Sequence, residues 1–330
     1  MYRGCSQILL AVVMALHPPV ALSDALEERV PLWESKALLC DPGPGAAPFP
    51  SKQTNDPAQP CDDGDMTLFN GLLCAAGDQR GCAGVAEAQD PVSGEWFRSP
   101  RIRLHGNDRG GASFSPDMAL GVELYLLSSK DQARAYKWLM WMDEHVACSL
   151  NVLGWCAVRA LPRFCTDDAP DGGCTMRHGD AATLAATVDF LQRQAGMPAL
   201  PDGRLRGHLG TFSGYGPAIA AIDANLNRPG YSQHLVAVSL WVLKAAGTTD
   251  PRLAEASQRL SQRAPDNAFF RFLSEGPTLA VRQKVLERCP AAATVLVQPL
   301  RQWQWEREEA DQAWRSSAYW DCLFMARLLQ

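Results

Sequence analysis

The sequence lacks the short motifs of several large enzyme classes. It contains no G-x-S-x-G, no H-E-x-x-H, no phosphate-binding loop and no dinucleotide-binding glycine pattern. These absences argue against a serine hydrolase, a zinc protease and a nucleotide-dependent enzyme. There is also no C-x-x-C and no Cys/His group with zinc-ligand spacing, so we expect neither a metal site nor another cofactor.

Basic residues and long apolar runs are also scarce. The 330 residues include 31 Lys and Arg against 36 Asp and Glu, which gives a formal net charge of −5. This mild acidity argues against nucleic acid or an anionic membrane as the main partner. No stretch reaches the ~20 consecutive apolar residues that a membrane-spanning helix needs, so we expect no membrane span.

The N-terminus has the pattern of a secretory signal peptide. Arg3 precedes an apolar run over residues 8–16, and Pro18 and Pro19 follow it. The small-x-small sequence at residues 21–23 is typical of a cleavage site. We therefore predict a signal peptide over residues 1–23 and an exported protein, either periplasmic or extracellular.

The cysteine count agrees with export. Apart from Cys5 in the predicted signal, ten of the 11 cysteines remain, and an even number is typical of a disulfide framework. The simplest hypothesis pairs neighbours along the chain, as Cys40–Cys61, Cys74–Cys82, Cys148–Cys156, Cys165–Cys174 and Cys289–Cys322. Eight residues of helix span about 12 Å, whereas bridged Cα atoms lie within about 7 Å. The second pair therefore needs a turn at Gly77 or Gly81, and the third needs a break near residues 151–154.

Hydrophobic periodicity predicts an all-α fold. After a Pro- and Gly-rich segment, apolar residues recur at helical spacing over residues 66–73. Ser115-Pro116 and Asp250-Pro251 have the cap-plus-proline pattern of a helix start, and Asp180 is predicted to cap a helix that runs through Gln194. Strand-like alternation is absent except for one candidate over residues 295–300.

The predicted helices suggest one domain preceded by an arm. We expect an extended N-terminal arm or loop over residues 24–64 and a single helical domain over residues 65–330. Ten or more helices, joined by alternately short and long loops and without a fixed sequence period, argue against a regular solenoid. A helical toroid of hairpins fits this pattern, and the alternative is an irregular helical domain.

This pattern resembles the six-hairpin (α/α) toroids found among secreted bacterial glycoside hydrolases and polysaccharide lyases. The resemblance covers most of the chain after the signal, and it consists of helix alternation, export and loops rich in Trp and acidic residues. No family motif is matched, so no catalytic position is transferred. The resemblance implies a site in a funnel at the loop end of the inner helices.

The first loop with suitable residues is 61–65. Asp65 lies just before a helix, where the helix dipole keeps a carboxylate ionised. It is either a catalytic carboxylate or a local helix cap, whereas Asp62 is expected to be a solvated cap residue.

The second loop covers residues 94–117 and ends on the first turn of an apolar helix. Asp117 is partly desolvated there, which raises a carboxyl pKa and suits the residue to act as a general acid. The alternative is an Asp that only interacts with the helix dipole. Trp96, Arg98 and His105 in the same loop are expected to hold a substrate.

The third cluster is C-terminal. Trp303 and Trp305 alternate, so both can form a stacking platform if this strip is extended. Asp321 lies in the apolar register of the last helix, where a buried carboxylate needs a partner. It is therefore either a second catalytic carboxylate or part of a structural ion pair. His178 and Tyr215 are further candidates for substrate contact.

These residues together favour an exported carbohydrate-active enzyme that acts on a polysaccharide or cell-envelope glycan. Asp117 would be the general acid, with Asp65 or Asp321 as the second carboxylate. In a lyase, Tyr215 or His178 would be the base. Two alternatives remain open at this point. One is a non-enzymatic exported protein that binds a partner protein or cell-wall component, and the other is a terpene- or lipid-processing enzyme.

Overall fold

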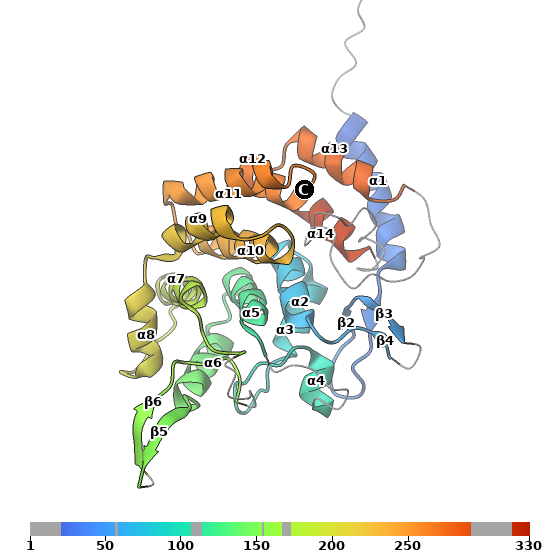
Figure 1. Cartoon of the computed structure of the whole chain (residues 1–330). Coiled ribbons are helices and arrows are strands. Elements are labelled where there is room, and N and C mark those ends of the chain that lie inside the picture. The colour runs from blue at the N-terminus through green and yellow to red at the C-terminus, as the bar shows by residue number, and fades with distance from the viewer. Residues whose placement is uncertain (1–20, 57–58, 107–113, 154, 167–172, 292–318) are drawn as a thin grey trace, which may run out of the picture.

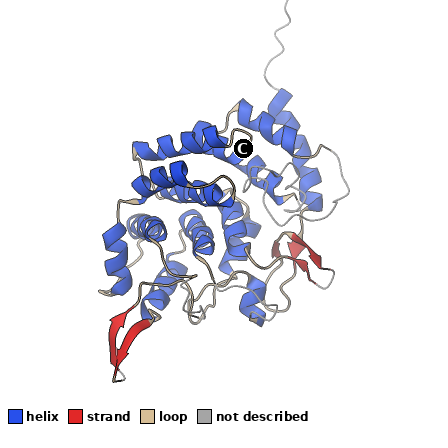
Figure 2. Cartoon of the chain, in the orientation of Figure 1, coloured by secondary structure: helices blue, strands red, loops and turns tan. Residues whose placement is uncertain are grey.

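The computed structural model describes residues 21–330 except 57–58, 107–113, 154, 167–172 and 292–318. These residues are mostly helical (Figures 1 and 2), which confirms the predicted all-α class. The helices are α1 (Ala21–Lys36), α2 (Met66–Ala75), α3 (Gln79–Ala86), α4 (Pro100–His105), α5 (Pro116–Ser129), α6 (Gln132–Glu144), α7 (His178–Ala195), α8 (Arg204–Phe212), α9 (Gly216–Leu226), α10 (Tyr231–Ala245), α11 (Pro251–Arg263), α12 (Ala268–Glu275), α13 (Leu279–Arg288) and α14 (Trp320–Leu328). Antiparallel pairs join β1 (Leu39–Cys40) to β2 (Phe49–Pro50), β3 (Gln53–Asp56) to β4 (Gln59–Cys61) and β5 (Cys148–Val152) to β6 (Trp155–Arg159).

The helices pack in several directions around α5. In Figure 1, α5 and α7 are seen nearly along their axes, α9 and α10 cross the view above them, and α11 and α12 lie above those. Helix α5 packs against α2, α7 and α10, and α9 packs against α10 and α11. A toroid of hairpins has roughly parallel helix axes, so this arrangement does not confirm the expected toroid.

Local capping determines where several helices begin. Pro116 and Pro251 occupy the first turns of α5 and α11 as predicted, and the Asp250 carboxylate accepts a hydrogen bond from Arg252 N at 2.9 Å. The prediction for Asp180 was wrong in detail. Helix α7 begins two residues earlier, at His178, and Asp180 lies in its first turn, where its carboxylate accepts from Arg177 N at 2.8 Å.

The predicted N-terminal arm contains a packed helix. Leu26 and Trp33 on α1 are buried, and the Trp33 indole donates to the carbonyl of Pro290 at 2.9 Å. Helix α1 packs against α13 and α14, because Leu26, Val30 and Trp33 form an apolar stripe at helical spacing. The extended conformation expected over residues 24–64 is therefore wrong for the part that α1 covers. The predicted signal peptide lies mostly outside the described residues.

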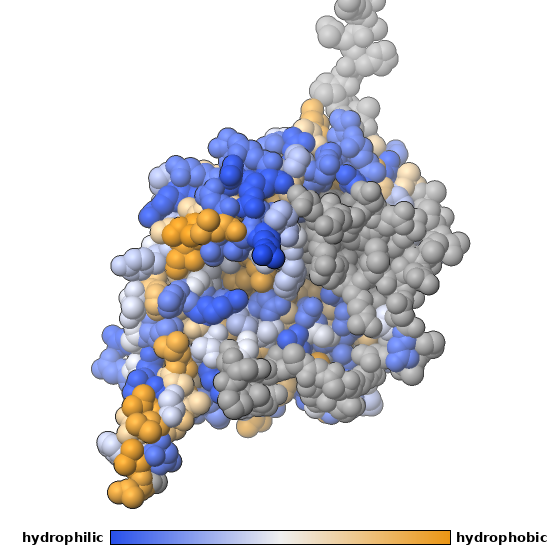
Figure 3. Space-filling model, in the orientation of Figure 1, coloured by the Kyte–Doolittle hydropathy of each residue, from blue (hydrophilic) through white to orange (hydrophobic). Residues whose placement is uncertain are grey.

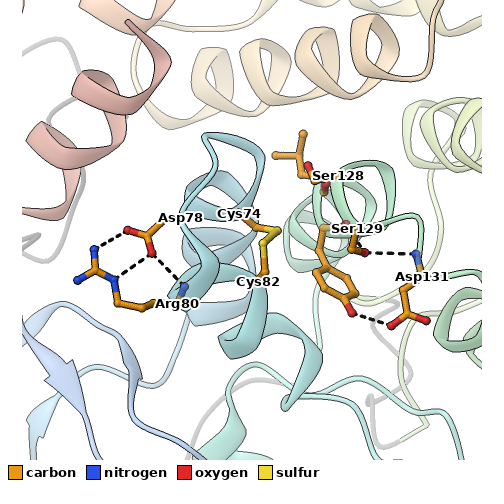
Figure 4. The surroundings of a disulfide bond; sticks show 9 residues. Cys74, Asp78, Arg80, Cys82, Ser128, Ser129 and Asp131 are labelled. Atoms are coloured by element: carbon orange, nitrogen blue, oxygen red, sulfur yellow. Dashed lines mark hydrogen bonds and ion pairs between the residues drawn. A yellow bond between two sulfur atoms is a disulfide. The ribbon is translucent and has the colours of Figure 1, made fainter. Parts of the chain in front are cut away.

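Four of the five expected disulfides are present: Cys74–Cys82, Cys148–Cys156, Cys165–Cys174 and Cys289–Cys322. The turn required by the first is at Gly77, whose φ of +92° favours glycine. Figure 4 shows this disulfide between α2 and α3, beside the ion pair of Asp78 and Arg80. The Cys40–Cys61 pairing stays a prediction.

The four disulfides indicate the redox environment of the protein. Several disulfides in one chain are typical of an oxidising, exported environment. Among the described residues, no helix combines the length and apolar character that crossing a bilayer requires.

Candidate functional site

A pocket of about 360 Å³ lies where α7, α9 and α10 meet, with α5 contributing to its wall. This volume is within the range of about 300–1,000 Å³ that is usual for small-molecule sites. Figure 1 shows these helices next to one another, with α9 and α10 over α7. Polar and apolar residues line the pocket together: Arg177, Asp180, Thr183, Asp223, Asn227, Ser232 and Ser239, with Leu120, Gly179, Gly216, Ile219, Ala220, Leu235, Val236 and Leu243.

The start of α7 brings an ion pair to the pocket. The guanidinium of Arg177 donates to both carboxylate oxygens of Asp180, at 2.9 and 3.0 Å. These bonds raise the pKa of Arg177, and the negative charges of Asp117 and Asp223 act in the same direction. Arg177 therefore stays positively charged within electrostatic range of three carboxylates.

Asp223 is the carboxyl group of the pocket that is free for chemistry. It lies near the end of α9 and is half-buried. No hydrogen bond from the described residues reaches its side chain, whereas Asp180 is fully engaged by Arg177. Burial raises the pKa of Asp223 above its ordinary value, although the positive charge of Arg177 opposes this effect. An acid of this kind retains its proton at a higher pH than an exposed aspartate does.

A second carboxyl group lies behind the pocket wall. Glu123 on α5 is fully buried, and its oxygens lie 3.2 Å from the hydroxyl of Thr183 and 3.1 Å from that of Thr187. Burial raises the pKa of Glu123 well above its ordinary value, the two threonine hydrogen bonds oppose the shift, and the charge of Asp180 adds to it. Glu123 therefore holds its proton to a higher pH than an exposed glutamate does.

The hydroxyl of Thr183 connects Glu123 to the pocket wall. This hydroxyl lies within hydrogen-bond distance of two acceptors, the Glu123 carboxyl group at 3.2 Å and the Asp180 carbonyl at 3.1 Å. This chain of hydrogen bonds fixes the first turns of α7, which carry Arg177 and Asp180, against α5.

Three of the predicted site residues belong to one network at the edge of this pocket. Arg98 donates to Asp65 at 2.8 Å and to the hydroxyl of Ser115 at 2.9 Å. Ser115 donates to one oxygen of Asp117, and the hydroxyl of Tyr231 donates to the other at 2.5 Å. Tyr231 immediately precedes Ser232 of the pocket, so the network runs from α2 past α5 to the start of α10.

Of the other predicted residues, two flank the pocket. His178 lies between the pocket residues Arg177 and Gly179, and its ring stacks on Phe212 at a centroid distance of 4.7 Å. Tyr215 precedes Gly216 of the pocket and is 59% exposed.

The remaining predicted residues lie elsewhere. Trp96 is a core residue, only 1% exposed, whose indole donates to the Val85 carbonyl at 2.8 Å, so it has no free face for a substrate. His105 contacts the carbonyl of Pro42 at 2.9 Å. Asp321 is buried in α14, where it accepts from Cys322 N at 2.9 Å, and it does not line the pocket. Trp303 and Trp305 lie outside the described residues.

Asp223, Glu123 and Tyr231 were not among the residues predicted from the sequence. A usable signal existed for the two acids, because each interrupts an apolar helical run, in A-I-A-A-I-D-A and A-L-G-V-E-L. Asp117 was singled out by a related pattern, a carboxylate on the first turn of an apolar helix. Tyr231 gave no signal, since only the fold brings it to Asp117, 114 residues away.

Within the described part of the chain, no group of three or more His, Cys, Asp or Glu side chains has a geometry that could hold a metal ion. Comparisons with protein-family models, with curated proteins and with solved structures found no match to this chain.

Proposed function

We propose that this chain is an exported carbohydrate-active enzyme that hydrolyses a polysaccharide or cell-envelope glycan in the pocket between α7, α9 and α10. Asp223 is its general acid. The observation that carries this assignment is a half-buried carboxyl group with a raised pKa that faces a pocket without a hydrogen-bond partner among the described residues. The assignment does not depend on the toroid, which the helix directions leave unconfirmed.

The lining of the pocket suits a sugar. A sugar ring presents hydroxyl groups at its edge and C–H groups on its faces, so it needs polar and apolar contacts at once. Asn227, Ser232 and Ser239 offer hydrogen-bonding groups, while Ile219 and Leu235 offer apolar surface. Tyr215, exposed beside the pocket, is available for a stacking contact with a further ring of the same glycan.

The reaction requires a proton donor and a proton acceptor. Asp223 gives its proton to the glycosidic oxygen as the bond from that oxygen to the anomeric carbon breaks. A water oxygen bonds to the anomeric carbon, and the proton of that water passes to a carboxylate. Asp117 takes this second role, because Ser115 and Tyr231 orient its carboxylate at the edge of the pocket while lone pairs remain free.

A polysaccharide lyase is the related alternative. It would remove a proton from the sugar ring with His178 or Tyr215, the two predicted residues that flank the pocket. The two activities differ in their products, since a lyase leaves a carbon–carbon double bond in the new terminal sugar and a hydrolase does not. Product analysis by mass spectrometry distinguishes them by the mass of one water molecule.

Replacing Asp223 with asparagine should remove most of the activity. Loss of a general acid lowers kcat by about 100- to 10,000-fold, and Asn keeps the size of the side chain. The measurement is the release of reducing ends from a panel of cell-envelope and storage polysaccharides. In the wild type, activity should fall as the pH rises through the raised pKa of Asp223, because the acid must be protonated.

Asp189→Asn is the matched control. Asp189 lies on the exposed side of α7 in a surface ion pair with Arg193, so this variant should keep full activity and nearly unchanged stability. If Asp223→Asn is folded and cleaves as fast as the wild type, the assignment is wrong. The same holds if the oxidised wild type cleaves none of the glycans.

A further inference from the structure

The β5–β6 hairpin projects from the helical body and has an exposed apolar face. Figures 1 and 2 show it extending beyond α6 and α8, and its strands contact chiefly each other. Leu153 at its tip is 101% exposed and Trp155 is 70% exposed. An isolated two-stranded hairpin is at best marginally stable in water, and here the Cys148–Cys156 disulfide holds the strands together.

The apolar side chains of the hairpin gather on one side. Leu150 pairs with Val158, and Val152 pairs with Trp155. Cross-strand partners share a face, and so do residues two apart in one strand. All four side chains are at least 44% exposed, and Figure 3 shows hydrophobic residues gathered along the projecting hairpin, with hydrophilic residues between some of them. Charged residues are absent from positions 147–158.

We propose that this face is the contact between two copies of the chain, with the two hairpins packed face to face about a two-fold axis. A self-complementary interface needs only one patch, present on both copies. An uncharged patch lets two chains of formal net charge −5 meet without local repulsion. The packing would place the four apolar side chains of each hairpin in the interior of a small sandwich.

Features of the hairpin favour a protein surface over a lipid bilayer. The apolar face extends from the tip up to Leu150 and Val158, so inserting it would carry both outer strand edges into the lipid. Each outer edge presents backbone N–H and C=O groups, which a bilayer cannot satisfy. In a face-to-face dimer these edges stay in water while the apolar face is covered.

The size of the patch sets the expected strength of the dimer. The four side chains of this face, together with Leu153 at the tip, expose on the order of several hundred Å², comparable with the largest patches on monomeric proteins of about 300–600 Å². A stable complex usually buries about 800 Å² on each partner. The dimer is therefore weak and reversible, with a Kd of the order of micromolar.

Analytical ultracentrifugation of the oxidised chain measures this association. A concentration range from about 1 to 200 μM spans the expected Kd. The wild type should shift from monomer to dimer, and the double variant Leu150→Ser with Trp155→Ser should stay monomeric with unchanged thermal stability, because both residues lie outside the core. Leu226→Ser is the control, since Leu226 is 75% exposed on α9 and this variant should dimerise like the wild type.

Two results would overturn the inference. One is a wild type that stays monomeric at the highest concentration, and the other is a dimer that persists in the double variant. If a monomeric wild type instead floats with phosphatidylcholine vesicles, and Trp155→Ser abolishes the flotation, then the hairpin binds lipid and the dimer proposal is wrong. The activity of the pocket is independent of each outcome.

Discussion

Replacing Gly121 with alanine should destabilise the protein by at least about 3 kcal/mol or prevent it from folding. Helices α2 and α5 cross at Gly71 and Gly121 with their backbones in contact. A Cβ atom on Gly121 would lie 2.5 Å from the Leu68 Cα, and one on Gly71 would lie 2.5 Å from the Gly121 carbonyl carbon. Because these neighbours are backbone atoms, only a separation of the two helices could relieve the overlap.

Gly210→Ala is the matched control for this substitution. Gly210 lies on the exposed face of α8, and an added Cβ would meet no atom within 4 Å. Alanine is a better helix former than glycine by about 1 kcal/mol, so this variant should be slightly more stable than the wild type. Urea unfolding followed by circular dichroism measures both changes. A loss of less than about 1 kcal/mol in Gly121→Ala would contradict the close crossing.

Replacing Glu123 with glutamine should change how stability depends on pH. The folded protein holds the Glu123 proton more tightly than the unfolded chain does, because burial raises the pKa well above the ordinary value of 4.5. Wild-type stability therefore falls as the pH rises from about 4.5 towards the pKa of the folded state, by up to about 1.4 kcal/mol per pH unit. Glutamine does not titrate, and its amide can still bond Thr183 and Thr187.

The quantity to measure is the difference in unfolding free energy between Glu123→Gln and the wild type at several pH values. This difference should be small at pH 4 and should increasingly favour the variant as the pH rises towards the raised pKa of folded Glu123. Glu255→Gln, at an exposed position of α11, should show no such trend. A difference for Glu123→Gln that does not vary with pH would mean that Glu123 titrates normally and is not held neutral.

The sequence predicted the elements that depend on local chemistry. Ser115-Pro116 and Asp250-Pro251 start helices through interactions within one turn, and the four confirmed disulfides join cysteines that are close in the sequence or at adjoining helix ends. The helix directions were not predictable in this way, because they depend on contacts such as the one between Gly71 and Gly121, 50 residues apart.

The β5–β6 hairpin escaped prediction for a different reason. Alternation of apolar and polar residues marks a strand with one buried face, but this hairpin has no buried face, and apolar residues occupy its exposed surface. The turn signal was also weak, because Leu153-Gly154 is not one of the Asn-Gly, Asp-Gly or Gly-Gly pairs typical of a two-residue hairpin turn.

Three of the residues predicted as site residues lie together in the structure. Asp65, Arg98 and Asp117 do lie in one network, because each is at or next to a helix start that faces the same region. Both oxygens of Asp117 accept hydrogen bonds, and our proposal assigns the role of general acid to Asp223 instead. Periodicity could not predict that Asp223 lies near Arg177 at the start of α7, because these two residues are far apart in the sequence.

The central claim is that a glycan occupies the pocket between α7, α9 and α10. Hydrogen–deuterium exchange of Asp223→Asn, with and without an oligosaccharide that the wild type cleaves, tests it most directly. Binding should slow exchange over residues 177–183 and 216–239, which line or adjoin the pocket. Protection confined to other segments, such as residues 61–75 or the hairpin over residues 148–159, would place the glycan elsewhere and contradict the claim.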